Sequence, residues 1–230
     1  MSVLEYTAEN HVGLVTLNRH EARNSMNPEL IVRLAELWTR LEEDESVRSV
    51  VLTGAGDSTF CSGFDLGKPV IAAVNGHAIA GGMELMLACD LRVVAKGVKL
   101  GLSEVALGLV PGMGGTALLQ RHVPNALAME LLLCAQPILG DDIAPSGLFN
   151  RLVDREAVLS ESLTIAEVIA GNAPLAVRAA RNVVRRSIDL TESEALQLES
   201  EAGAQLSQTK DAVEGPLAFM EKRSPNFQGK

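Results

Sequence analysis

The feature that most constrains the fold is a short, uninterrupted apolar run, Val70–Val74, which a turn dipeptide, Asn75-Gly76, brings to an end. A run of this length is too short to span a membrane, and its turn boundary indicates a buried strand. Small residues follow, among them Gly81-Gly82, and the next apolar segment, through Cys89, is predicted to be a short helix. The centre of the chain is therefore predicted to be a strand, a turn and a helix.

Strand-like and helix-like segments alternate on both sides of this unit. After a polar opening segment, strands are predicted at residues 11–18, 47–53, 91–95 and 98–100. Asn27 is predicted to cap a helix that has Pro28 in its first turn. The apolar residues of that helix recur at helical spacing, and they are Leu30, Leu34, Leu37, Trp38 and Leu41. The strand–strand–helix order favours an α/β fold with stacked sheets over a flat doubly wound sheet, although spacing alone does not separate the two.

The rest of the chain is predicted to be mostly helical. Helices are predicted at residues 116–122, 126–134, 143–147, 156–170, 175–188, 192–207 and 212–223. We therefore divide the chain into a core with the site at residues 1–140 and a helical region at residues 141–230. The last helices are only moderately apolar, as is typical of helices that cover another domain or another subunit.

Composition excludes several classes of function. The net charge of −9 argues against general binding of nucleic acid. The three cysteines are widely spaced, and with no CxxC motif or histidine pair they do not predict a metal site. Without a secretory signal or a membrane-length apolar run, the chain is predicted to be cytoplasmic, away from membranes, with reduced thiols.

Two acidic residues in apolar surroundings carry the chemistry. Glu84 and Glu104 both lie among apolar neighbours, where burial would raise a carboxyl pKa toward the range useful for proton transfer. Gly81 directly precedes a helix, whose first N–H groups can stabilise an oxyanion, and the turn at residues 61–65 could supply a second N–H. The turn Pro111–Gly115 lacks the spacing of a nucleotide-binding loop and is predicted to pack beside the site.

Each of these features also has a purely structural interpretation. The glycine pair could serve only to allow tight packing of strand against helix. Glu84 could be a structural acid paired with Arg92 or Arg121, and Glu104 could be a charge at a helix N-terminus. The residues alone leave these alternatives open.

Several segments together resemble one family. They are LNRHEARNSMN, TFCSGFDL, KPVIAAVNGHAIAGGMELMLACDLRVV, LGLSEVALGLVPGMGGT and EKRSPNFQGK. Over nearly the whole chain they resemble the crotonase family, and most closely its enoyl-CoA hydratases. The resemblance implies a spiral of ββα units, a helical C-terminal region used in trimerisation, often as a dimer of trimers, and a site for a coenzyme A thioester.

The resemblance also implies roles for individual residues. The backbone N–H groups of Phe64 and Gly81 match the family's oxyanion hole, and Glu84 and Glu104 match its two catalytic glutamates. The positions that match substrate and coenzyme A contacts are Arg23, Asn24, Ser62, Asp65 and Leu66. The resemblance also places Lys222 and Arg223 near the nucleotide end of coenzyme A, in the site of a neighbouring subunit.

The implied reaction is addition of water across the 2,3 double bond of a 2-enoyl-CoA, which gives a 3-hydroxyacyl-CoA. No metal or redox cofactor is expected, and coenzyme A enters only as part of the substrate. The alternatives are an enoyl-CoA isomerase, another crotonase-type lyase or hydrolase, and a non-catalytic acyl-CoA-binding protein. Because many relatives with other reactions lack one or both acids, the presence of both favours hydration.

One departure from the family pattern concerns the acyl pocket. Asp65-Leu66-Gly67 runs directly into Lys68, where family members usually carry a few tens of residues, including a helix that flanks this pocket. Either the loop is truly short or a mobile segment is missing here. We expect the second, because the segments on either side match the family and a link this short leaves little chain to span the pocket. The resemblance therefore does not indicate which acyl chain is preferred.

Overall fold

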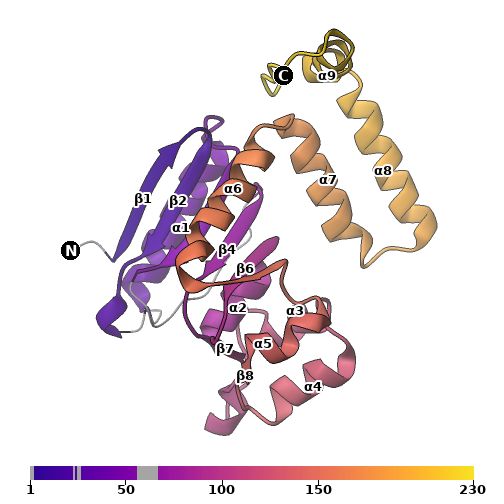
Figure 1. The fold of residues 1–230 in the computed structure, drawn as a ribbon. Coiled ribbons are helices and arrows are strands. Elements are labelled where there is room, and N and C mark those ends of the chain that lie inside the picture. Colours follow the sequence, from indigo (N-terminus) through magenta and orange to yellow (C-terminus); the bar gives the residue numbers. More distant parts are fainter. Residues whose placement is uncertain (1–2, 23, 25–26, 56–66) are drawn as a thin grey trace.

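The computed structural model describes residues 3–22, 24, 27–55 and 67–230, and it contains two sheets with helices around them (Figure 1). Within these residues the larger sheet has six strands, which in spatial order are β1 (Leu4–Glu9), β2 (Val12–Leu17), β3 (Ser49–Gly54), β4 (Val70–Val74), β6 (Leu91–Ala95) and β9 (Arg151–Val153). β1 pairs antiparallel with β2, and all the other pairs are parallel. Helix α6 (Val158–Ala170) packs against β2, β3, β4 and β6.

The predicted central strand is confirmed as β4, and all five of its residues are buried. Its neighbour β3 is buried along its whole length and pairs Val50 with Val70. Inner strands of a parallel sheet are buried on both faces when helices cover the sheet, so continuous apolar runs are typical of them.

The second sheet shows how the chain builds its repeating unit. It consists, within the described residues, of β5 (Ala78–Ile79), β7 (Lys99–Gly101) and β8 (Ile138–Leu139). The chain passes from β4 in the large sheet to β5 in the small one and then into helix α2 (Gly81–Ala88), and it passes likewise from β6 to β7. This strand–strand–helix arrangement confirms the predicted α/β fold with stacked sheets.

The first long helix follows its predicted pattern closely. α1 runs over Pro28–Glu43, and the Asn27 side chain accepts a hydrogen bond of 2.9 Å from the Leu30 N–H. The buried residues of α1 are those that the spacing indicated, namely Leu30, Leu34, Leu37, Trp38 and Leu41. Periodicity and a side-chain cap are local signals, which is why the sequence alone predicts this helix.

The later helices are confirmed to within a few residues. They include α3 (Gly115–Leu119), α4 (Asn125–Leu133), α7 (Pro174–Ser187), α8 (Glu192–Leu206) and α9 (Lys210–Glu221). The helix expected at residues 143–147 is instead a short α-helix, α5 (Gly140–Ile143), followed by a 3-10 turn. α8 and α9 stand apart from the sheets in Figure 1, and α8 has no buried residue.

Some strands were missed by the sequence prediction. The polar opening segment contains β1, an edge strand whose residues are mostly exposed, so its composition does not mark it as a strand. β5, β8 and β9 have only two or three residues each, and they are defined by their partners in the sheets. Because β9 and α6 both follow residue 140 and join the large sheet, that sheet draws on both predicted regions of the chain.

Helix α7 is attached to the sheets through one carboxylate. Asp90 accepts hydrogen bonds from the Val70 N–H (2.9 Å), from Arg181 Nε (2.8 Å) and from Arg185 Nε (3.0 Å). Arg185 also donates to the carbonyl of Ala88 at the end of α2. Helix α7 is thus connected through Asp90 to the start of β4 and directly to the end of α2.

A helix that spans a membrane needs both sufficient length and high mean hydropathy. No single helix in the described part of the chain meets both requirements. One pair, Arg155–Ala170 with Pro174–Ser187, meets them only when taken together, and it is bent by 109° at the break.

Candidate active site

The start of α2 presents backbone N–H groups, as the glycine pair predicted. Ala80 precedes the helix with φ of 53° and ψ of −124°, a combination that costs an L-residue about 1–3 kcal/mol. The Ala80 N–H is held by the carbonyl of Gly101 (2.9 Å), and no side chain among the described residues caps the helix. The first-turn N–H groups, including that of Gly81, therefore have no partner within the helix, and they coincide with the positive end of its dipole.

Glu84 is held by a turn that lies far from it in the sequence. Its side chain is buried, and Oε1 accepts hydrogen bonds from the N–H groups of Met113 (2.7 Å) and Gly115 (2.9 Å). The prediction that the turn at Pro111–Gly115 packs beside the site is thereby confirmed. The alternative pairing of Glu84 with an arginine is wrong.

Arg92 and Arg121, the two alternative partners of Glu84, bind other groups. Arg92 donates to the carbonyl of Cys89 (2.9 Å) and lies 3.4 Å from His122 Nδ1. Arg121 forms an exposed ion pair with Asp189 at 2.8 Å. The carboxylate of Glu84 is therefore oriented by backbone amides.

Gly115 is a positioning residue that the sequence reasoning did not single out. A Cβ atom at this position would lie 2.8 Å from Pro111 Cβ, 3.0 Å from Leu102 Cδ2 and 3.1 Å from Glu84 Cγ. Only a residue without a side chain lets the turn approach Glu84 closely enough for its N–H to donate. The glycine-rich turn was visible in the sequence, but its contact with Glu84 was not.

Glu104 begins a short 3-10 helix, Glu104–Leu107, so the structural interpretation placed it correctly. However, its Oε2 atom is buried and accepts no hydrogen bond from the described residues. Burial raises the pKa of Glu104, and the nearby charge of Glu84 raises it further, although backbone hydrogen bonds at Glu104 and Ser103 lower it. Two carboxyl groups from different elements therefore lie close enough for the charge of one to act on the other.

Asn24 is completely buried, and its side chain makes contacts within the protein. Its Oδ1 accepts a hydrogen bond from the Arg19 N–H (2.9 Å), and its Nδ2 donates to the carbonyl of Ala55 (2.9 Å). This side chain therefore fastens the loop after β2 to the end of β3. Its contact with coenzyme A stays a prediction.

Five predicted site residues lie outside the described part of the chain: Arg23, Ser62, Phe64, Asp65 and Leu66.

Near the C-terminus, Arg223 is bound to the carboxylates of Glu214 and Glu221, both at 2.6 Å. Lys222 ends α9 in a left-handed conformation with φ of 54°. A role for either residue at the nucleotide end of coenzyme A stays a prediction.

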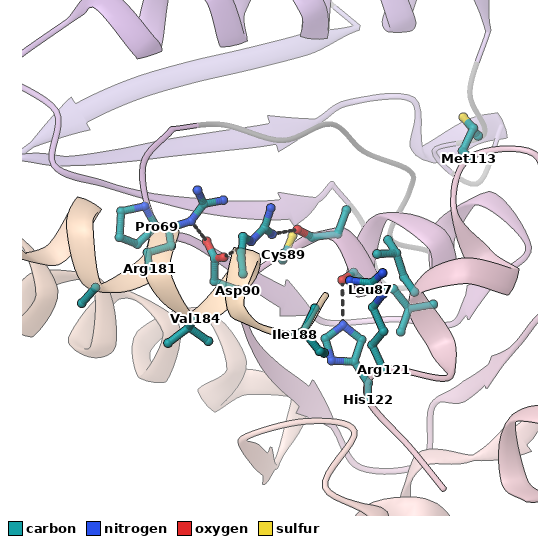
Figure 2. A pocket seen from close by; sticks show the side chains of 14 residues that line it. Pro69, Leu87, Cys89, Asp90, Met113, Arg121, His122, Arg181, Val184 and Ile188 are labelled. Atoms are coloured by element: carbon teal, nitrogen blue, oxygen red, sulfur yellow. Dashed lines mark hydrogen bonds and ion pairs between the residues drawn. The ribbon is translucent and has the colours of Figure 1, made fainter. Parts of the chain in front are cut away.

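A cavity of about 800 Å³ lies next to the turn that holds Glu84. Met113, whose N–H binds Glu84, contributes its side chain to the cavity wall (Figure 2). The described residues contain no cluster of three or more histidine, cysteine, aspartate or glutamate side chains that could hold a metal ion. The site therefore offers carboxyl groups and backbone amides, and Met113 connects it to the cavity.

The sequence model of a family described as Enoyl-CoA hydratase/isomerase matches this chain in two segments, residues 7–68 and 65–230. The two matches meet at the short link before Pro69. A relative from Thauera aromatica, (E)-benzylidenesuccinyl-CoA hydratase, is 36% identical over 247 residues, and the match covers 96% of each chain. Because that alignment is longer than the 230 residues of this chain, the relative carries additional residues.

Other relatives agree in sequence and in fold. The short-chain-enoyl-CoA hydratase of Clostridium acetobutylicum is 34% identical, and the match covers 94% of this chain and 93% of the relative. A solved structure of enoyl-CoA hydratase from Bacillus anthracis superposes with a TM-score of 0.95 at 34% identity, over 100% of both chains. The family that the sequence segments resembled is thereby confirmed, and this chain belongs to the enoyl-CoA hydratase/isomerase family.

Proposed function

We propose that this protein is an enoyl-CoA hydratase, which adds water across the 2,3 double bond of a 2-enoyl-CoA to give a 3-hydroxyacyl-CoA. One observation supports the proposal: Glu84, held by two amides, lies close enough for its charge to raise the pKa of Glu104, whose buried Oε2 has no hydrogen-bond partner among the described residues. Membership of the family supports it independently. Coenzyme A enters as part of the substrate.

The first task of the site is to stabilise negative charge on the thioester oxygen. We assign one donor to the N–H of Gly81, in the uncapped first turn of α2, and the second to the N–H of Phe64. Both donors polarise the conjugated double bond and stabilise the enolate as charge moves onto oxygen. Loss of one such donor typically raises the barrier by about 2.7–4 kcal/mol.

The second task is the transfer of two protons. Glu84 activates the water, whose hydroxyl oxygen forms a bond to C3 while the released proton goes to Glu84. Glu104, whose pKa is raised by burial, delivers a proton to C2. Exchange of one proton between the two carboxyl groups restores the starting state. Since acid–base chemistry and amide donors suffice, we propose that no metal or redox cofactor takes part.

The direct test follows the absorbance of the conjugated thioester when purified protein is mixed with crotonyl-CoA. Hydration consumes the conjugated double bond, so the absorbance should decay, and product analysis should find 3-hydroxybutyryl-CoA. A product in which the double bond has only moved would indicate an isomerase. Tight binding of the thioester without any change in absorbance would indicate a non-catalytic acyl-CoA-binding protein.

We further propose a homotrimer, alone or as a hexamer of two trimers, in the cytoplasm. α8 and α9 carry large apolar side chains that are exposed in the single chain, namely Leu196 (60%), Val213 (67%), Phe219 (85%) and Met220 (72%). Such surface is costly in water unless another chain covers it. Light scattering should give three or six times 24.4 kDa, whereas a monomer would refute the assembly.

Cytoplasmic location is supported by the free thiols of Cys89 and Cys134.

A further inference from the structure

Helix α2 contributes two groups to the proposed reaction, and both lie near its N-terminal end. The Gly81 N–H is in the first turn, and Glu84 lies one turn further on. The first N–H groups must stay open toward the thioester oxygen, and no side chain of the described residues caps them. Because a helix of eight residues makes few internal hydrogen bonds, its position has to be fixed from elsewhere.

The C-terminal end of α2 is fixed by side chains from outside the helix. The last four carbonyls of a helix have no partner within it, and here each of them accepts a hydrogen bond from an arginine or a histidine. The pairs are Arg92 Nη1 with Met86 (3.3 Å) and Cys89 (2.9 Å), His122 Nε2 with Leu87 (3.2 Å), and Arg185 Nη2 with Ala88 (2.7 Å). Cations at this end also interact favourably with the helix dipole.

Arg92 reaches this helix end from the centre of the large sheet. It lies in β6, pairs with Ala72 of β4, and is only 6% exposed. A buried charge is costly unless it is paired or hydrogen-bonded, and Asp90, two residues away, is paired with Arg181 and Arg185. Among the described residues, the hydrogen-bond partners of the Arg92 guanidinium are therefore the α2 carbonyls and His122.

His122 completes this group in one defined tautomer. Arg92 Nη2 can only donate, so His122 Nδ1, 3.4 Å away, accepts, and Nε2 carries the hydrogen that binds the Leu87 carbonyl (Figure 2). Burial and the charge of Arg92 lower the pKa of His122 to about 4, so the ring is neutral near pH 7. His122 also follows α3, whose first residue, Gly115, donates to Glu84.

We propose that Arg92, together with His122, is a positioning residue for the reaction: by holding the C-terminal carbonyls of α2, it keeps the Gly81 N–H and Glu84 aligned with the thioester. The proposal rests on the hydratase function proposed above. At 1.5 Å per residue, the seven steps from Gly81 to Ala88 span about 10 Å, so Arg92 acts through the helix. A displacement of reacting groups by about 1 Å can lower a rate about a hundredfold.

The test replaces Arg92 by methionine, which keeps the length of the side chain but removes its donors. Arg92→Met should lower kcat for crotonyl-CoA by about 10–100-fold, because the reacting groups are displaced. Binding of butyryl-CoA, a saturated thioester that does not react, should change little in calorimetry. Arg92→Lys, which keeps a charge and part of the hydrogen bonding, should recover part of the lost kcat. Parent-like kcat in a folded Arg92→Met protein would overturn the proposal.

Two variants of His122 ask the same question with less disruption of the buried charge. His122→Ala removes the donor to Leu87, whereas His122→Gln keeps a donor at a similar distance from the backbone. We expect kcat to fall in His122→Ala and to recover in His122→Gln. Equal kcat in the parent and in both variants would overturn the role of His122, even where Arg92→Met does not fold.

Arg48→Met is the matched control. Arg48 also binds the C-terminal end of a helix, since its Nη1 donates to the carbonyl of Ala170 in α6 (3.1 Å). Helix α6 carries none of the proposed reacting groups, so Arg48→Met should lower the midpoint of thermal unfolding without a selective loss of kcat. Equal losses of kcat in Arg48→Met and Arg92→Met would assign the effect to general stability and overturn the proposal.

Infrared spectroscopy of butyryl-CoA, isotope-labelled at its thioester carbonyl, reports on the alignment of the Gly81 N–H. Hydrogen bonding lowers the stretching frequency of a carbonyl, so the band should shift when the thioester binds the parent protein. The shift should be smaller in Arg92→Met and unchanged in Arg48→Met. A purely structural role of Arg92 would leave the shift as it is in the parent.

The infrared measurement also separates this proposal from the proposed function, because it requires binding and no turnover. A parent protein that shifts the carbonyl band without hydrating any 2-enoyl-CoA would refute the hydratase function, and a smaller shift in Arg92→Met would still support the positioning role. Hydration by the parent, with kcat and the carbonyl shift both unchanged in Arg92→Met, would refute the positioning role alone.

Discussion

Replacing Gly115 by alanine tests how Glu84 is positioned without changing either acid. The new Cβ would lie 2.8 Å from Pro111 Cβ and 3.1 Å from Glu84 Cγ, both shorter than ordinary contacts. Overpacking of this kind typically costs about 1–3 kcal/mol. The turn can relieve it only by moving away from α2, which lengthens the hydrogen bonds from the Met113 and Gly115 N–H groups to Glu84.

The expected loss of kcat follows from those two hydrogen bonds. A hydrogen bond to a charged group is worth about 1.5–3 kcal/mol, so losing the equivalent of one should lower kcat by about 10–150-fold. Binding of the thioester should change little, because the Gly81 amide remains. The midpoint of thermal unfolding should fall by roughly 2–4 °C for each kcal/mol of strain in a chain of this size.

The assay is hydration of crotonyl-CoA by Gly115→Ala, with kcat and KM determined separately and thermal unfolding measured on the same sample. Gly112→Ala is the matched control, since a Cβ at Gly112 meets nothing within 4 Å. A purely structural role for Gly115 would lower stability without a selective loss of kcat. Parent-like kcat in a folded Gly115→Ala protein, or an equal loss in Gly112→Ala, would refute the reasoning.

Three further predictions concern the acids and the attachment of α7. Glu84→Gln and Glu104→Gln should each lower kcat by more than about a hundredfold while acyl-CoA affinity, measured by calorimetry, stays nearly unchanged; near-normal turnover in both would contradict the mechanism. Because burial raises the pKa of Glu104, its contribution to stability is fully present below the unfolded-state pKa and is lost as pH rises through the folded-state pKa. Both the hydration rate and the free energy of unfolding should therefore decline across that window, and Glu104→Gln should remove this decline in stability; a decline that persists in the variant would assign it to another group. Asp90→Asn, which weakens a mostly buried double ion pair, should cost about 2–4 kcal/mol in urea unfolding, whereas Asp154→Asn, in an exposed pair with Lys96, should cost at most about 1 kcal/mol; similar losses would contradict the difference in burial.

Much of the fold could be predicted because its signals are local. The buried face of α1 is readable from the spacing of Leu30, Leu34 and Trp38, and the Asn27 cap marks where the helix begins. The all-apolar run of β4 indicates burial on both faces. Such patterns depend on neighbours within a few residues, so they survive without knowledge of the tertiary structure.

Other elements have no local signal. β1 is a polar, mostly exposed edge strand, which only its antiparallel pairing with β2 defines. β5 has two residues, and its pairing with β7 joins Ala78 to Leu100 across the chain. Strands this short form because neighbouring strands of the sheet pair with them.

The site, like the fold, combines features that local sequence indicates with features that only the tertiary structure shows. Apolar context alone marked Glu84 and Glu104 as candidate acids, because an unpaired carboxylate among apolar residues is costly. The sequence could not indicate that backbone amides orient Glu84, since Met113 and Gly115 lie 29 and 31 residues away.

The sequence by itself determined most of the helices, the inner strands of the large sheet and the two candidate acids, because these signals depend on neighbours along the chain. Only the tertiary structure decided that Gly115 must lack a side chain, that a buried oxygen of Glu104 has no partner among the described residues, and that a cavity opens between α2, α3 and α7. These properties arise from contacts between segments distant in sequence, and their geometry exists only once the chain is packed.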